Sequence, residues 1–486
     1  MSPMQHNPSS QAKALHKRRA VAVYRSRNCY PLLFCIFFLL SPGLAAAVET
    51  QSFRLVDAFR RAQLNDTQIL ATQAEFVVQK EQSRSVQAQL LPQVSLSSNV
   101  EMHKQELRTS GFVPFNDDFN TQGFNLQLSQ SLYNPQTFAA WQQERVDAER
   151  AEVQLHAVEQ ELMFQVASSY FDVMISQESV ESVNAQMTAI ARLYVQAKTA
   201  YRDGDAAIID IDEIRSTLDS MRLQSVMAKS DLEVKKQRLR KLTGHLPARL
   251  ANTLRSGLEV LLESEEMFLW EKKALLSSPA VRIAKLDYLG ARKQVDVAES
   301  EYYPMLDLVI SHNQNNRGVD HSLETIAALQ LELPLYQGGA TMARTREARA
   351  NEEKMKYLLH DVSDQVILDV REAYLDVKNG RLLMHSAYQA FDSGQKLLDS
   401  TYQAFDDGIR GSLDILNAQL GLFESQREMV RSEYNFLTSI LRLKLIAGVL
   451  VLADLREVDR FLDTAALPGK NRLLGNAVGA GAYQVD

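Results

Sequence analysis

Cysteine is almost absent from this sequence of 486 residues. The two cysteines, Cys29 and Cys35, both lie in an N-terminal segment that we expect to be removed. A mature chain without cysteine excludes disulfides, thiolate metal sites and cysteine nucleophiles. It also excludes a lipid anchor attached to an N-terminal cysteine after cleavage.

The sequence also lacks an apolar run long enough to cross a membrane as a helix, which takes about 20 residues. The apolar run Pro31–Leu40 is short, follows six basic residues and precedes Ala45-Ala46-Ala47. This pattern predicts a secretory signal peptide over residues 1–47 rather than a membrane anchor. If the mature protein spans a membrane, it must do so as a closed β-barrel, because only helices and barrels satisfy every backbone group in lipid.

An excess of basic residues is missing too. Six of the 53 basic residues and none of the 60 acidic residues fall in residues 1–47, so the mature net charge is 47 minus 60, or −13. An acidic secreted chain does not favour a nucleic-acid partner. The sequence has no phosphate-binding glycine loop, and its nine scattered histidines show no metal-ligand spacing. We therefore expect no enzyme activity, no cofactor and no metal site.

An internal duplication is the most informative feature that is present. The segment Ser169–Val173 (SYFDV) matches Ala373–Val377 (AYLDV) at an offset of 204 residues. The same offset pairs Gly204 with Gly408, Asp210 with Asp414, and Gly244 with Gly448. A register kept over so long a stretch predicts two structural repeats.

Each half of the chain predicts a helix, two strands and then two long helices. The first helix is expected from about residue 53 to residue 91, ended by Pro92. The long segment 136–202 contains neither proline nor glycine and as a helix would be on the order of 100 Å long. Apolar and polar residues alternate in the strand pairs 93–102 with 124–132 and 305–313 with 324–333.

Strands of this length with one apolar face are typical of transmembrane barrels. The alternative is a soluble hairpin that covers a core with one face. Four strands cannot close a barrel, because small barrels need about eight. The barrel interpretation therefore requires an oligomer, and three copies would supply twelve strands.

Together these features resemble the TolC family of outer-membrane efflux and secretion channels. The resemblance covers residues 49–455 and is carried by segments 91–96, 128–133 and 334–339 and by the two helical-hairpin tips. It implies a mixed, mainly α fold: a homotrimer with a twelve-stranded barrel in the outer membrane, continued by a periplasmic coiled-coil barrel. The implied divisions are residues 1–47, 48–244, 245–278, 279–448 and 449–486. Of these, 48–244 and 279–448 are the repeats, 245–278 is an equatorial linker, and 449–486 is a partly disordered C-terminal segment.

The resemblance also assigns residues at the hairpin tips. Arg410 falls at the gate-linking arginine and Asp210 at its acidic partner, whereas Phe405 replaces a tyrosine. Asp414 falls at the first position of an aspartate ring that constricts the pore, and Asn417 replaces the second aspartate. The tip residues implied to dock a periplasmic adaptor are Gly204, Asp205, Gly408, Ile409 and Gly411. Ordinary helix capping is the alternative for Asp210 and Asp414, since carboxylates are favoured at helix starts.

Three functions follow from these patterns. The first is a passive exit duct for type I protein secretion, coupled through a periplasmic adaptor to an inner-membrane ABC transporter or a proton-driven pump. The second is a duct for small toxic molecules. The third is a coiled-coil scaffold of the envelope that has no pore and conducts no ions. The absence of a lipidation cysteine and the tip sequences favour the first.

Overall fold

A computed structural model describes residues 53–107, 115–204, 207–245, 253–254, 266–317 and 320–463. All of them belong to one unit, Thr50–Asp486. The expected signal peptide (1–47) and the C-terminal residues 464–486 lie outside the described residues. The described chain is mainly helical, with a four-stranded antiparallel sheet, so the predicted mixed, mainly α class is confirmed.

The first helical segment is two helices instead of the one predicted. Helix α1 spans Leu55–Asn65 and α2 spans Thr67–Ala88. Asp66 between them has extended backbone angles, and its carboxylate accepts hydrogen bonds from the N–H groups of Gln68 (2.9 Å) and Ile69 (3.1 Å). An aspartate N-cap inside an otherwise helical pattern therefore breaks the helix.

The four-stranded sheet has the order β1-β2-β4-β5, and every pair is antiparallel. Its strands are β1 (Gln93–Leu107), β2 (Phe115–Tyr133), β4 (Met305–Arg317) and β5 (Asp320–Glu332). They contain nearly all of the predicted strand residues but run further. Segments such as 103–107 lack apolar alternation, yet their backbone still pairs with β2, because the ladder needs no particular side chain.

The two faces of the sheet differ in polarity. The register places Val94 opposite Leu128, and Leu128 opposite Ile310, so apolar side chains share one face. Val94 is 66% exposed and Leu96 is 71% exposed. The residues Ser97, Asn125 and Asn313 align on the other face. In one protomer the apolar face is thus uncovered.

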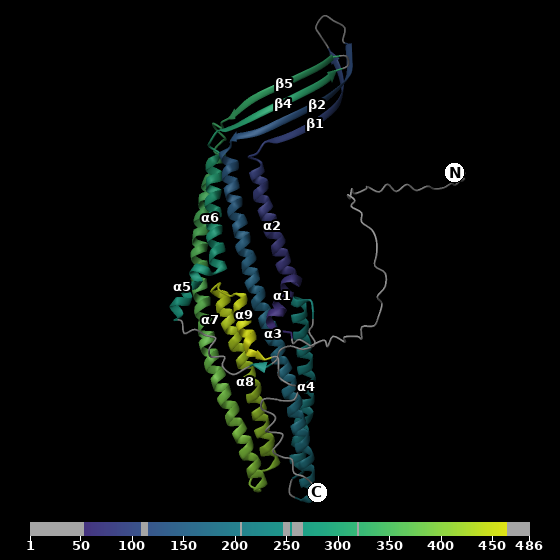
Figure 1. The fold of residues 1–486 in the computed structure, drawn as a ribbon, viewed down its shortest axis with the longest axis vertical. Coiled ribbons are helices and arrows are strands. Elements are labelled where there is room, and N and C mark those ends of the chain that lie inside the picture. The colour runs from purple at the N-terminus through teal and green to yellow at the C-terminus, as the bar shows by residue number, and fades with distance from the viewer. Residues whose placement is uncertain are drawn as a thin grey trace, which may run out of the picture. The chain divides into compact units, whose positions relative to one another are not determined.

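Two long helical hairpins follow the two strand pairs (Figure 1). Their helices are α3 (Pro135–Asp203), α4 (Ile208–Thr243), α7 (Ala340–Asp406) and α8 (Ser412–Ile446). Helices α3 and α7 have 69 and 67 residues, and α4 and α8 have 36 and 35. The helix α6 (Pro279–Ser300) precedes β4 as α2 precedes β1. None of the described helices is both long and apolar enough to cross a membrane.

The segments outside the hairpins contact one another and the long helices. Helix α5 (Met267–Ser277) contacts α6 and α7, and α9 (Leu452–Phe461) contacts α1 and α3. The short strand β3 (Thr253–Leu254) pairs with β6 (Leu462–Asp463). Through this strand pairing, the predicted linker 245–278 contacts the C-terminal segment 449–486.

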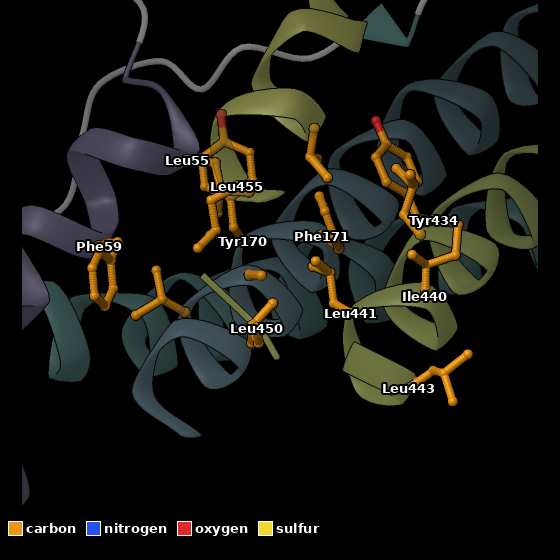
Figure 2. Close-up of a cluster of buried hydrophobic side chains, with 14 of the residues drawn as sticks. Leu55, Phe59, Tyr170, Phe171, Tyr434, Ile440, Leu441, Leu443, Leu450 and Leu455 are labelled. Carbon is orange, nitrogen blue, oxygen red and sulfur yellow. The ribbon is translucent and has the colours of Figure 1, made fainter. Parts of the chain in front are cut away.

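A first hydrophobic cluster holds α1, α3, α7, α8 and α9 together. Figure 2 shows members of this cluster from α1, α3, α8 and α9. Leu55, Phe59, Tyr170 and Phe436 in this cluster are fully buried. Burial of each large apolar side chain stabilises the fold by about 1.5–3 kcal/mol. The Tyr170 hydroxyl donates a hydrogen bond to the carbonyl oxygen of Phe53 at 2.8 Å, which satisfies its buried polar end.

Candidate functional site at the hairpin tips

The second hairpin tip is a tight turn between α7 and α8. The carbonyl oxygen of Ala404 accepts hydrogen bonds from the N–H groups of Ile409 (2.8 Å) and Arg410 (3.1 Å). Gly408 has a φ of 75°, a left-handed conformation that costs glycine little. Both bonds satisfy the carbonyl group of Ala404 at the end of α7, and the side chains of Ile409 and Arg410 are exposed.

Arg410 and Asp414 form a charged cluster at the start of α8. The Arg410 Nη1 donates to Asp414 Oδ1 at 3.0 Å, and the N–H of Gly411 donates to Asp414 Oδ2 at 3.0 Å. The hydrogen bond from the Gly411 backbone, followed by the charge of Arg410, lowers the pKa of Asp414. Asp414 therefore caps α8 as an anion, as the capping alternative predicted.

The first tip contains the predicted acidic partner of the gate arginine. Helix α3 ends before Gly204, whose φ is 91°, and α4 begins at Ile208. Asp210 lies in the first turn of α4 and makes no ion pair within the described part of one protomer. Asp205 lies outside the described residues. One protomer therefore joins Arg410 to Asp414 and does not join it to Asp210.

The remaining predicted residues lie around this cluster. Phe405 is half-buried and contacts the hydrophobic residues beneath the tips. Asn417 is exposed on α8, three residues after Asp414 and hence near the same face of the helix. Ile209 and Ile409 expose 67% and 75% of their surface. Each tip therefore exposes an isoleucine side chain.

A second hydrophobic cluster, here called the tip cluster, holds the ends of the hairpins together. Its fully buried members include Ile190 of α3, Ile214 of α4 and Ile415 of α8. A tyrosine that the sequence did not single out also joins the hairpin, because Gln419 Nε2 donates to Tyr402 Oη at 2.7 Å. Burial raises the pKa of Tyr402. The helical spacing of Tyr402 with Phe405 and Leu398 could have marked it as an inward residue.

The described residues include no group of three His, Asp or Glu side chains placed to hold a metal ion. The described residues of the tips offer charged side chains, exposed isoleucines and a defined turn. Their chemistry suits docking and electrostatic control of a passage.

Comparisons with known proteins bear on this arrangement. The family model described as outer membrane efflux protein matches residues 58–245 and 270–449. The outer membrane protein TolC of Vibrio cholerae is 28% identical over 433 residues, which cover 87% of this chain and 96% of that protein. The alkaline protease secretion protein AprF of Pseudomonas aeruginosa is 24% identical, with coverages of 92% and 94%. The outer membrane channel CmeC of Campylobacter jejuni matches the fold with a TM-score of 0.72 at 16% identity, with coverages of 86% and 91%.

Proposed function

This chain belongs to the outer membrane efflux protein family, and we propose that it is the passive exit duct of a tripartite export system. The resemblance to TolC-type channels drawn from the sequence is confirmed. The chain is a protein of the outer membrane and is not an enzyme. The observation that supports the duct most is the family match over both halves of a chain whose sheet exposes an apolar face.

Three protomers would close one barrel of twelve strands. In one protomer β1 and β5 are the edges of the sheet, and each leaves a row of unpaired backbone groups. Pairing β1 with β5 of the next protomer would remove both edges. The apolar face, which includes Val94 and Leu96, would then contact lipid, and the polar face would line the pore.

The helical hairpins would continue this duct into the periplasm. Residues 48–244 and 279–448 would act as two repeats whose hairpins, six in the trimer, surround one passage. Residues 245–278 and 449–486 would form a belt around the helices. The β3–β6 pairing and the contact of α5 with α7 support this assignment of the belt.

The hairpin tips would form the gate and the adaptor-docking surface. Arg410 is exposed and already linked to an acid in its own protomer, so a neighbour's Asp210 could compete for it in the closed trimer. The three copies of Asp414 would form a ring that attracts cations. Exposed Ile209 and Ile409 would contact a periplasmic adaptor bound to an inner-membrane ABC transporter or proton-driven pump.

The cargo that we propose is protein, exported by type I secretion. Similarity to an alkaline protease secretion protein over 92% of this chain favours this choice. Efflux of small molecules is the second candidate, because the family is described by efflux. Deletion of the gene in its own host distinguishes protein secretion from efflux of small molecules. We expect an exported protein to disappear from the medium, whereas increased sensitivity to toxic compounds with unchanged extracellular protein would favour efflux.

A further inference from the structure

Two aromatic rings and a cation share one face of α3 next to the sheet. Phe138 is 48% exposed, and the centroid of its ring lies 5.7 Å from that of Trp141. The guanidinium of Arg145 lies over the Trp141 ring, with 5.3 Å between Cζ and the ring centroid. Residues three or four positions apart lie on one side of a helix. The three side chains therefore form a single surface, here called the aromatic face.

Arg145 has no acidic partner. In the part of the chain that the structure describes, no carboxylate pairs with it, and its contact is the Trp141 ring. Arg349 stands 204 residues later, at the offset of the sequence duplication, and donates to Glu299 of α6 at 2.7 Å. An arginine stacked on a ring keeps N–H donors for an anion. The aromatic face therefore offers an anionic ligand an uncommitted cation.

The aromatic face belongs to a helix whose two flanks are already covered. Beside the sheet the helices contact one another in the order α2-α3-α6-α7, and Figure 1 shows α2, α3 and α6 side by side below the sheet. On the α6 side, Lys293 Nζ donates to Gln142 Oε1 at 2.9 Å, and Arg150 pairs with Asp287. A second copy that extends this layer would contact α2 or α7. The partner of the aromatic face is therefore sought outside the protein layer.

The apolar face of the sheet continues down to the start of α3. The register places Tyr133, the last residue of β2, opposite Leu306, and Leu306 opposite Leu331. Tyr133 and Leu331 are both exposed. The N–H of Phe138 bonds to the carbonyl oxygen of Asn134 at 3.1 Å, so Phe138 lies one helical turn beyond the sheet. Exposed apolar surface thus reaches from the strands to the aromatic face.

The aromatic face matches the thickness of a headgroup layer. Trp141 lies about 4.5 Å further along the helix axis than Phe138. Side chains of a helix lean toward its N-terminus, so Arg145 reaches back toward the sheet as far as Trp141. Headgroups add roughly 5–8 Å to each side of the hydrocarbon core, and tryptophan is favoured in this region. Exposed Glu149 and Glu152 follow further from the sheet, where water is expected.

We propose that the aromatic face binds anionic phospholipid of the inner leaflet of the outer membrane. The rings of Phe138 and Trp141 contact the part of the acyl chains nearest the headgroups, and the guanidinium of Arg145 binds a headgroup phosphate. The level of this surface rests on the proposed function, which places the sheet in the membrane and the hairpins in the periplasm. A position of the aromatic face inside the water-filled passage is the outcome that would exclude lipid.

Tryptophan fluorescence can test this surface because the chain has two tryptophans, Trp141 and Trp270. Trp270 is 7% exposed and lies in the first hydrophobic cluster, so Trp270→Phe leaves Trp141 as the reporter. In vesicles of phosphatidylglycerol and phosphatidylcholine, bromine near the headgroup should quench Trp141 more strongly than bromine near the chain end. The control is Leu96→Trp in the protein that carries Trp141→Phe and Trp270→Phe, where the fluorophore lies on the apolar face of the sheet and chain-end bromine should quench it.

The preference for anionic lipid tests Arg145. Mixtures of brominated phosphatidylglycerol with unbrominated phosphatidylcholine, and the reverse, give the relative affinity of the two lipids at Trp141. Arg145→Gln should lower the preference for phosphatidylglycerol roughly fivefold, the effect of one cation at a membrane surface. Arg349→Gln is the matched control, since Arg349 pairs with Glu299, and it should leave the preference unchanged.

The outcomes separate this surface from the duct. An unquenched Trp141 beside a quenched Leu96→Trp variant overturns the lipid surface and leaves the duct intact. Absence of quenching in both proteins contradicts the transmembrane sheet as well as the lipid surface. An equal lipid preference in Arg145→Gln and the parent protein overturns the phosphate contact. Should Trp270→Phe fail to fold, the difference in quenching between wild type and Trp141→Phe reports Trp141 instead.

Discussion

Arg410 donates a hydrogen bond to Asp414 at 3.0 Å, across one turn at the start of α8. The sequence resemblance had assigned the two residues separate roles, one as a gate link and the other as a pore-lining ring. In the protomer they are a single unit, and Gly411 fixes the carboxylate through its backbone N–H. A change at Arg410 should therefore alter both the gate and the charge of the ring.

Replacing Arg410 with serine should open the proposed gate. The variant loses the cation that Asp414 and a neighbour's Asp210 would share. We expect the resting conductance in planar bilayers to rise several-fold. Arg222→Ser is a matched control, because Arg222 is also exposed and pairs with a nearby acid, Asp219, at 2.6 Å. Equal conductance in wild type and Arg410→Ser, with trimers intact, would refute the gate assignment.

Block by multivalent cations should depend on Asp414 and Asn417. Replacing Asp414 with asparagine removes the proposed ring of three carboxylates, so half-maximal block should need a higher cation concentration. Asn417→Asp adds a second ring and should lower that concentration. Block is measured by titrating a trivalent cation into the bilayer chamber. If both variants are blocked like the wild type, these residues do not line the constriction.

The pH dependence of this block follows from the lowered pKa of Asp414. Above the ordinary aspartate pKa of 3.8, Asp414 is charged and its full contribution to stability is present. Both are lost only as pH falls through the lower pKa of Asp414 in the folded protein. Block should therefore remain constant from neutral pH to about pH 4.5. Relief of block at mildly acidic pH in the wild type would indicate that another group carries it.

Asp459 should stabilise the start of α1. Its carboxylate on α9 accepts hydrogen bonds from the backbone N–H groups of Leu55 (3.0 Å) and Val56 (3.1 Å). Asp459→Ala leaves two buried donors without partners and should lower the free energy of unfolding by about 1–3 kcal/mol. Asp361 of α7 is exposed, so the control variant Asp361→Ala should change the free energy of unfolding little. Equal denaturant midpoints for the two variants would contradict this role.

A series of glycine-to-alanine variants separates backbone strain from steric conflict. Gly448 has a φ of 71°, and an added Cβ would lie 2.4 Å from the carbonyl oxygen of Ser277. Gly204 has a φ of 91° with no atom within 4 Å of the Cβ position, so alanine there adds only about 1–2 kcal/mol of strain. Gly421 lies within α8, and no atom lies within 4 Å of its Cβ position. Alanine at this position should stabilise the protein by about 1 kcal/mol. Thermal unfolding should rank Gly448→Ala as the least stable variant, and any other order would contradict the turn geometry.

The long elements were predictable because their physical signals are local. Absence of proline and glycine over 136–202 sufficed to predict α3, which spans Pro135–Asp203. Apolar alternation located all four strands, although it stopped short of their polar ends, where backbone pairing alone continues the ladder. The break at Asp66 was missed, because one aspartate cap interrupts the helix without disturbing the apolar pattern.

The tips were only partly predictable. The glycine positions and the duplicated aspartates predicted where the turns lie, and both turns are there. The bond between Arg410 and Asp414 depends on the exact start of α8, which depends in turn on the Gly411 cap. The hydrogen bond from Arg427 of α8 to Gln186 of α3 joins residues more than 200 positions apart. No periodicity in one sequence could have paired them.

Single-channel recording of the purified mature protein in planar bilayers tests the central claim most directly. The account predicts discrete, small openings from a trimer, because the sheets close into a pore and the tips keep its periplasmic end nearly shut. A folded trimer that never conducts, even as Arg410→Ser, would contradict the exit duct and favour the envelope scaffold.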